Sequence, residues 1–458
     1  MSTTALPLFA RVLRPFQRFV ATESAGGVVL LLSALIALAW ANSPWSESYV
    51  HLWETPLGLR VGDGGFVLSL HHWINDGLMA VFFFVVGLEI KREMLVGELS
   101  SPRQAALPVA AALGGMIVPA LIYVAFNAGG PGAAGWGIPM ATDIAFALGV
   151  LALLGPRVPV GLKIFLAALA IADDIGAVLV IAFFYTSAIS WTSLAAGGVI
   201  LLCLVGLNIF GRHRPWPYLV LGALLWVAFM KSGIHASVAG VALAMTIPAR
   251  TRVHEAEFLR RARESIDEFE RACQPGETVL TNHAQQEAIA SLEQHAEAVQ
   301  SPLLTLEHRL HGVVAFVIMP VFALANAGVD VRGGLLDSLS LSIVGGVVAG
   351  LLLGKPLGIT LFSWAAVRTG VAALPQTTWR GLHGVSWLGG IGFTMSLFIA
   401  SLAFSDESLL NSAKVGILTA SVIASLVGAI LLRKTGNDEG SRPESEREET
   451  AEHISPVV

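Results

Sequence analysis

Apolar runs of membrane-spanning length recur along this chain and decide its fold class. A helix needs about 20 mostly apolar residues to cross the roughly 30 Å hydrocarbon core of a bilayer. Only 13% of the 458 residues are charged, against roughly a quarter in a soluble domain. The sequence therefore predicts an all-α polytopic membrane protein with twelve transmembrane helices, at 24–41, 71–90, 105–126, 136–154, 160–185, 192–210, 216–230, 234–248, 311–327, 340–364, 382–403 and 412–432.

Basic residues between the runs predict the orientation of the spans, because Lys and Arg concentrate in cytoplasmic loops. Arg11, Arg14 and Arg18 precede the first span, Arg433 and Lys434 follow the last, and most other loop cations fall on the same side. Both termini are therefore expected in the cytoplasm. The N-terminal segment 1–23 is expected to be cytoplasmic, and the acidic tail 435–458 to be disordered.

Two stretches outside the spans are expected to form secondary structure. Between the first two spans, 45–69 contains Asp63-Gly64, which predicts a small periplasmic β-hairpin. A two-stranded ribbon is marginally stable alone, so pairing with a second protomer and a simple capping loop both fit it.

The second stretch, 251–305, separates spans 1–8 (24–250) from spans 9–12 (306–434). Arg, Glu, Ala and Gln dominate it and predict two helices, 253–272 and 282–300, with a break at 274–276. We expect a charged cytoplasmic helical insertion, and the simplest interpretation is a solvated hairpin without chemistry.

Two adjacent acids, Asp173 and Asp174, lie in the middle of the fifth run. An ionised carboxylate at bilayer depth costs about 2.5–3.5 kcal/mol on insertion scales, so such residues are functional candidates by default. Neighbouring residues on a helix point about 100° apart, so the two acids need not face the same surroundings. The pair is predicted to exchange protons for a hard cation such as Na⁺ or Li⁺. The structural alternative is an ion pair that ties helices together.

Spans four and eleven contain helix breakers where a simple span would carry Leu and Val. The first reads GWGIPMATDIAF (135–146) and the second GVSWLGGIGFTMS (384–396). Each is the middle member of a three-span block, and blocks 3–5 and 10–12 would run in opposite directions. This arrangement permits an inverted repeat with two broken, crossing helices.

Three further polar residues are expected near these breaks. Asp143 would offset the partial positive charge of a half-helix or ligate an ion, and Thr142 would supply an oxygen. Lys355 lies too deep in span ten to reach the interface, so a partner is expected among Asp173, Asp174 and a half-helix carbonyl. A static structural pair is the alternative for Lys355.

Acidic and histidine residues gather at the cytoplasmic ends of spans two and nine. Because histidine titrates near neutrality, these residues suit pH sensing, although an ordinary solvated helix end would look similar. The candidates are Glu89, Glu93, Glu307, His308 and His311, with Asp76 and His235 as weaker ones.

Six motifs, in order along the chain, resemble the bacterial Na⁺/H⁺ antiporter NhaA family. They are NDGLMAVFFFVVGLEIKRE (75–93), ATDIAFALG (141–149), AIADDIG (170–176), FALANAG (322–328), GKPLG (354–358) and GIGFTMS (390–396). The resemblance covers about 16–434. It implies twelve spans, an inverted-repeat fold in the bacterial inner membrane, and a homodimer joined partly through the hairpin.

The resemblance also implies an activity. Cytoplasmic Na⁺ or Li⁺ would be exchanged for external protons by alternating access, electrogenically, with two protons per Na⁺ and activation at alkaline pH. Na⁺ or Li⁺ would compete with protons at Asp173 and Asp174; Thr142 and Asp143 match the broken-helix positions, and Lys355 the nearby base. The residues tied to pH activation match Glu89, Glu93, Glu307, His308 and His311.

Other features of the sequence bound this interpretation. No cofactor, enzymatic activity or nucleic-acid partner is expected. The family usually has a short loop where this chain carries 251–305, so the insertion before Glu307 makes the pH profile uncertain. A passive cation channel is an alternative function. An intramembrane aspartyl protease fits poorly, because its two carboxylates must converge on one water.

Overall fold

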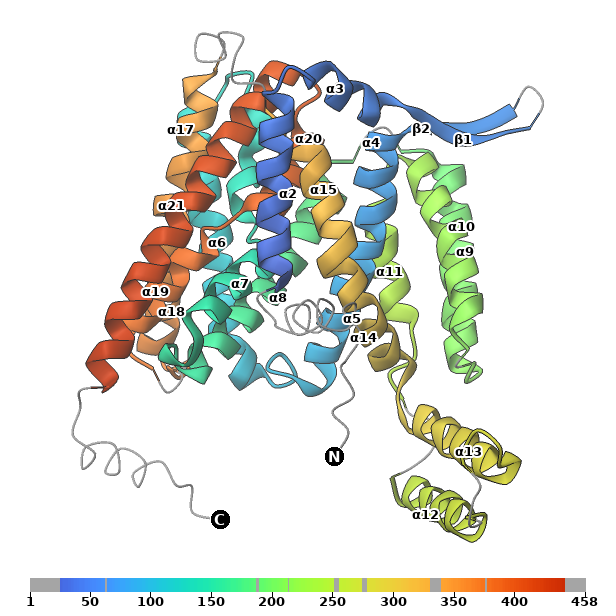
Figure 1. Ribbon diagram of the computed structural model, residues 1–458. Helices are drawn as coiled ribbons and strands as arrows, with labels where there is room; N and C mark the ends of the chain where they lie inside the picture. The colour runs from blue at the N-terminus through green and yellow to red at the C-terminus, as the bar shows by residue number, and fades with distance from the viewer. Residues whose placement is uncertain are drawn as a thin grey trace, which may run out of the picture. The chain divides into compact units, whose positions relative to one another are not determined.

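The computed structural model describes residues 25–61, 64–186, 189–212, 214–250, 255–273, 278–329, 339–374 and 377–440 (Figure 1). The predicted N-terminal segment, the tail beyond 440, Asp63 and the predicted break at 274–276 lie outside these residues. The helices form two compact units. The first comprises the described residues up to Met79, then Glu93–Thr186 and those from Val314 onward; the second comprises Ala80–Arg92 and Ser187–Val313.

The first unit contains the β-hairpin and both broken spans. Within it α18 packs along α6, α19 packs against α21, and α15 packs against α2. Its elements are α2 (Ala25–Ala41), α3 (Ser46–Glu54), β1 (Pro56–Val61), β2 (Gly64–Ser69), α4 (Leu70–His72), α6 (Pro102–Asn127), α7 (Ile144–Leu154), α8 (Val160–Phe184), α15 (Met319–Asn326), α17 (Leu341–Ala349), α18 (Lys355–Arg368), α19 (Trp379–Gly389), α20 (Phe393–Ala403) and α21 (Glu407–Gly440).

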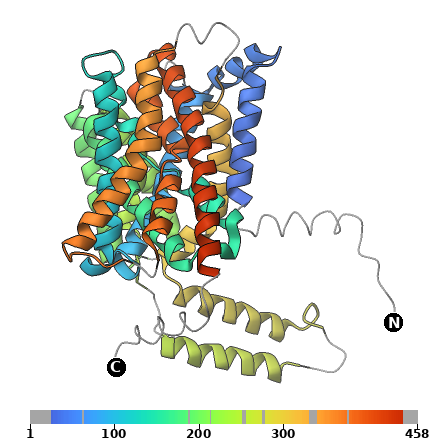
Figure 2. The ribbon, with the colours of Figure 1, turned by 90° about the vertical axis from the view of Figure 1, so that its left-hand side faces the viewer.

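The second unit contains most of α5 and the charged insertion. Its helices are α5 (Met79–Val96), α9 (Trp191–Ile209), α10 (Pro215–Ser232), α11 (Ser237–Thr246), α12 (Glu255–Arg271), α13 (His283–Val299) and α14 (Pro302–Val313). The two helices predicted for the insertion are α12 and α13, which lie side by side in both views (Figures 1 and 2). Ser265 of α12 is buried against Ser291 and His295 of α13.

The apolar helices confirm the polytopic all-α fold. Among the described residues, eight helical segments are long and apolar enough to cross a membrane, and two bent helix pairs bring this number to ten. The other two predicted spans, 216–230 and 234–248, coincide with α10 and with the ten-residue helix α11. Every predicted span therefore falls on a helix, although length and composition alone support ten.

Short turns of π-helix precede two prolines inside the spans. The turns are Val314–Ile318, before Pro320 in α15, and Gly350–Gly354, before Pro356 in α18. Proline has no N–H, so it cannot bond the carbonyl four residues earlier, and that carbonyl falls inside the π-turn each time. The turn before Pro356 directly precedes Lys355. A third π-turn, Trp73–Leu78, joins α4 to α5.

Spans four and eleven are broken at the predicted places. A 3₁₀ helix, Ala133–Met140, contains Pro139 and is followed by extended residues before α7 begins at Ile144. In span eleven, α19 ends at Gly389 and α20 begins at Phe393, with a bend of 44° between them. A second short 3₁₀ turn, Gly155–Arg157, follows α7.

The hairpin after the first span is shorter than predicted. Its strands pair antiparallel from Pro56 opposite Ser69 to Val61 opposite Gly64, whereas the residues before it form helix α3. Tyr49 and Trp53, one helical turn apart, are buried and stack edge to face. The Tyr49 hydroxyl also donates to the carbonyls of Leu324 and Ala325. These aromatic contacts favour a helix, and turn and strand patterns do not reveal them.

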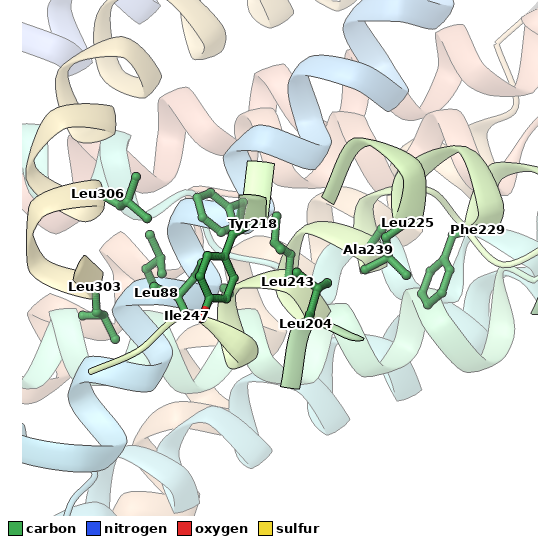
Figure 3. Packing of buried hydrophobic residues seen from close by; sticks show 12 residues of the cluster. Leu88, Leu204, Tyr218, Leu225, Phe229, Ala239, Leu243, Ile247, Leu303 and Leu306 are labelled. Carbon is green, nitrogen blue, oxygen red and sulfur yellow. The ribbon is translucent and has the colours of Figure 1, made fainter. Parts of the chain in front are cut away.

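Aliphatic and aromatic side chains from five helices form the core of the second unit (Figure 3). Close helix contacts depend on glycine. A Cβ atom built on Gly240 of α11 would lie 2.2 Å from the backbone oxygen of Ala80 and 2.9 Å from the nitrogen of Phe84 in α5. The backbones of α5 and α11 therefore touch. The core residues are Phe84, Leu88, Leu204, Tyr218, Leu225, Phe229, Ala239, Leu243, Ala244, Ile247, Leu303 and Leu306.

This contact predicts that Gly240→Val destabilises the second unit by about 1–3 kcal/mol, the usual cost of overpacking. The midpoint of thermal unfolding in detergent should fall. Gly206→Ala on α9 is the matched control, because a Cβ atom there meets nothing within 4 Å. An equal loss of stability in the two variants would contradict the close packing of α5 and α11.

Candidate functional site

Lys355 is the buried cation on which the site in the first unit centres. Its side chain is 1% exposed, and its ammonium group donates to two oxygens. Asp173 Oδ2 lies 2.7 Å from Lys355 Nζ, and Thr142 Oγ1 lies 2.9 Å from it. Of the three partners left open by the sequence, Asp173 is the one to which the ammonium donates.

Glycines allow α18 to bring Lys355 this deep. A Cβ atom on Gly358 would lie 2.1 Å from the carbonyl oxygen of Gly114 in α6, so the two backbones are in direct contact. A Cβ atom on Gly354, at the end of the π-turn, would lie 2.7 Å from the Cα atom of Pro119 in α6. In the GKPLG motif, the lysine is therefore flanked by two glycines, Gly354 and Gly358, at which the contact with α6 leaves no room for a side chain.

Asp173 and Asp174 both lie in the buried middle of α8, where they are 1% and 2% exposed. One oxygen of Asp173 binds Lys355, and the other, Oδ1, accepts no hydrogen bond from any residue that the structure describes. A buried carboxylate oxygen without a donor is costly. A cation or a proton at this position would remove that cost.

Asp143 joins the two broken helices. Its Oδ1 accepts from the Phe146 amide at 2.9 Å and so caps α7. Its Oδ2 accepts from both the amide and the hydroxyl group of Thr394, in the first turn of α20. One carboxylate therefore offsets the positive ends of two helices. This geometry favours charge balancing over ion ligation, the two roles that the sequence left open for Asp143.

Thr142 connects Lys355 to the other side of the break. Its hydroxyl accepts from Lys355 and donates to the carbonyl of Gly389, the last residue of α19, at 2.8 Å. Two more bonds join the breaks: the Asp143 amide donates to the Ile391 carbonyl, and the Ser396 hydroxyl to the Ile138 carbonyl. The broken helices therefore meet at their breaks, as the predicted fold requires.

The candidates for pH sensing lie mainly in the second unit. Glu89 Oε1 of α5 is 3.8 Å from His311 Nδ1 of α14, and Glu307 Oε1 of α14 is 3.4 Å from Arg92 Nε of α5. His308 instead lies 2.9 Å from the Leu304 carbonyl of its own helix. The structure thus brings Glu89, Glu307 and His311 to the contact of α5 with α14.

The remaining predicted residues have local contacts. Glu93 accepts from the Glu98 amide at the end of α5. Asp76 pairs with His72 at 2.7 Å, and His235 Nδ1 lies 2.8 Å from the Ser237 hydroxyl group.

Sequence reasoning missed Arg92 and Thr394 as partners. Both lie inside the recognised motifs: Arg92 directly before Glu93, and Thr394 as the second residue of α20, after the break in span eleven. Their positions within these motifs were therefore the only sequence signal that could have identified them as partners.

Comparisons with known proteins identify the family of the chain. Residues 17–432 match the family model described as Na⁺/H⁺ antiporter 1. The chain belongs to this family. It is 51% identical over 424 residues to the Na⁺/H⁺ antiporter NhaA of Oleidesulfovibrio alaskensis, covering 92% of this chain and 94% of the relative. It is 50% identical over 440 residues to that of Acidithiobacillus ferrooxidans, covering 94% and 100% respectively.

Membership of the Na⁺/H⁺ antiporter 1 family confirms the predicted class of protein. The chain is a multi-pass membrane protein from a family of transporters, and its relatives are named for the exchange of sodium and protons. Na⁺ and H⁺ are the substrates that the family implies.

The buried pair predicts a distinctive stability pattern. Lys355→Gln leaves the Asp173 carboxylate unpaired, and Asp173→Asn leaves the ammonium unpaired, so each should cost about 3–5 kcal/mol. The double variant removes both charges and should lose much less than the sum. The measurement is the free energy of unfolding in detergent, with exposed Lys231→Gln as the control. Additive losses would show that the two charges do not interact.

Proposed function

We propose that this protein exchanges cytoplasmic Na⁺ or Li⁺ for external protons at Asp173 and Asp174. The observation that carries the proposal is the buried Lys355–Asp173 pair beside a second buried acid. A cation that reaches Asp173 competes directly with the ammonium group for the same carboxylate. Occupation by Na⁺ and occupation by protonated groups therefore exclude one another, which is the requirement for exchange.

The ligand chemistry supports a hard cation as the substrate. Hard cations take oxygen ligands. The two carboxylates and the Thr142 hydroxyl would supply such oxygens, and all three residues are buried away from solvent. The carboxylates alone do not distinguish Na⁺ from Li⁺, so both are proposed as substrates.

The meeting of the two broken helices supports alternating access. Inverted-repeat transporters, of which the NhaA family is itself a known example, place their substrate site at discontinuous helices near the membrane midplane. Here Thr142 and Asp143 hold the breaks together through side-chain hydrogen bonds. We propose that these bonds rearrange when the ion replaces the Lys355 ammonium at Asp173, opening the site to one side at a time.

The proposed cycle moves one net charge. Asp174 carries one proton and the Lys355 ammonium group carries the second. Both protons leave when Na⁺ binds, so Lys355 becomes neutral, and two protons enter for each Na⁺ that leaves. The membrane potential contributes about 2.3 kcal/mol per 100 mV to the inward movement of one charge. This is enough to extrude Na⁺ against roughly a fiftyfold gradient.

Regulation and assembly complete the proposal. Alkaline pH would activate exchange by changing the charges at the contact of α5 with α14, where Glu89, Glu307 and His311 gather. The two-stranded hairpin has open strand edges, and an isolated ribbon is marginally stable, so we propose that it pairs with the hairpin of a second protomer. The protein would reside in the bacterial inner membrane with both termini in the cytoplasm.

The site predicts that Asp173→Asn and Asp174→Asn each abolish exchange. Everted membrane vesicles with an imposed pH gradient should release protons when Na⁺ or Li⁺ is added to the wild type, between about pH 7 and 9. Asp406→Asn is the matched control, because this exposed acid caps α21 and asparagine caps equally well. Undiminished exchange in both site variants would exclude Asp173 and Asp174 as the ion site.

A further inference from the structure

A small polar network joins α18 to α19 one turn beyond the residues of the ion site. It consists of Thr360 of α18 with His383, Ser386 and Trp387 of α19. Thr360 Oγ1 lies 2.9 Å from His383 Nδ1 and 3.2 Å from Ser386 Oγ. The Trp387 indole Nε1 lies 3.2 Å from His383 Nε2. None of these four residues belongs to the site described above.

The partners of His383 determine its protonation state. An indole N–H only donates, so His383 Nε2 must be an unprotonated acceptor. A neutral imidazole carries one proton, which therefore sits on Nδ1 and is donated to Thr360. Thr360 in turn can donate to Ser386, whose hydroxyl donates to the His383 carbonyl at 2.7 Å. Every donor then has an acceptor, and the network fits the neutral ring.

A second proton on His383 does not fit this arrangement. It would place an N–H on Nε2, directly facing the indole N–H of Trp387 at hydrogen-bond distance. Two donors cannot share a hydrogen bond, so the ring and the indole must separate. Protonation therefore loosens Trp387 while leaving the bond from Nδ1 to Thr360 intact.

Trp387 connects this network to the ion site. Its carbonyl accepts from the Gly390 amide and so closes the last turn of α19. The same turn presents the Gly389 carbonyl to Thr142, whose hydroxyl accepts from Lys355. A displaced Trp387 thus acts on the turn that holds Thr142 in contact with the ammonium group.

Charged groups near α19 do not offer His383 an alternative partner. On the helices packed against α19, the charged residues are Lys163, Asp173 and Asp174 of α8, Lys355 and Arg368 of α18, and Glu407, Lys414, Arg433, Lys434, Asp438 and Glu439 of α21, while α7 has none. Arg380 lies on α19 itself. Within the part of the chain that the structure describes, none of the carboxylates forms an ion pair with His383.

We infer that His383 is a positioning residue whose neutral imidazole holds the last turn of α19 in place, and whose protonation disengages that turn and lowers exchange at acid pH. The inference rests on the proposed function, because it concerns the pH dependence of the same ion site. It adds a proton-sensitive contact inside the first unit to the cluster at α5 and α14.

Two substitutions separate the roles of the ring and of the indole. His383→Gln can still bond Thr360 and Trp387 but cannot take up a proton, so exchange should persist to lower pH, with its midpoint moved by roughly 0.5–1 pH unit, the equivalent of one hydrogen bond. Trp387→Phe removes the indole N–H that the neutral ring holds, so the last turn of α19 is released at every pH and exchange should be reduced even at alkaline pH.

The test is Na⁺-driven proton release from everted vesicles, measured from pH 6 to 9 in wild type and both variants. His51→Gln, on the exposed face of α3, is the matched control and should keep the wild-type midpoint. A wild-type midpoint in His383→Gln, or undiminished exchange at alkaline pH in Trp387→Phe, would overturn the role of His383. A wild-type protein that exchanges no Na⁺ would instead overturn the proposed function.

Discussion

A lysine ammonium group cannot stay charged in an apolar interior without a partner, and the arrangement of the first unit follows from this constraint. Moving a charge of this size out of water costs several kcal/mol even after relaxation, and only a well-placed counter-charge with further hydrogen bonds repays it. Lys355 has such a counter-charge in Asp173 and one further oxygen in Thr142. Gly114 of α6 and Gly358 of α18 let the two helices approach closely enough for the lysine to reach these groups.

The same constraint explains why the broken helices meet at this depth. Unwound backbone has unpaired amides and carbonyls, which hydrocarbon cannot satisfy. Asp143 takes up amides from α7 and α20, while Thr142 and the Asp143 amide take up carbonyls at the end of α19. Each break thus supplies hydrogen-bonding groups for the unpaired backbone of the other. A change at one break therefore affects the hydrogen bonds of the other, and on this basis we propose that an ion at Asp173 changes the positions of the helices.

The sequence predicted the parts of this structure that depend on pattern and left open those that depend on distance. Apolar runs located every helix of the membrane-spanning part, and Gly and Pro located both breaks. Lys355 had three possible partners, because its sequence position says nothing about which one lies within reach. Helix α3 was missed because its burial depends on Tyr49 reaching residues almost 280 positions away. The proposed role of His383 was missed because it depends on hydrogen bonds with two partners, and one of them, Thr360, lies on another helix.

Competition between a cation and protons for Asp173 and Asp174 is the central claim, and proton release on binding tests it most directly. Purified protein in detergent, at about pH 8 in a weakly buffered solution, should release protons when Na⁺ or Li⁺ is added, and Asp173→Asn and Asp174→Asn should abolish the release. Titration calorimetry in buffers of different ionisation heat would give the number of protons. Binding of Na⁺ without proton release in the wild type would contradict the account.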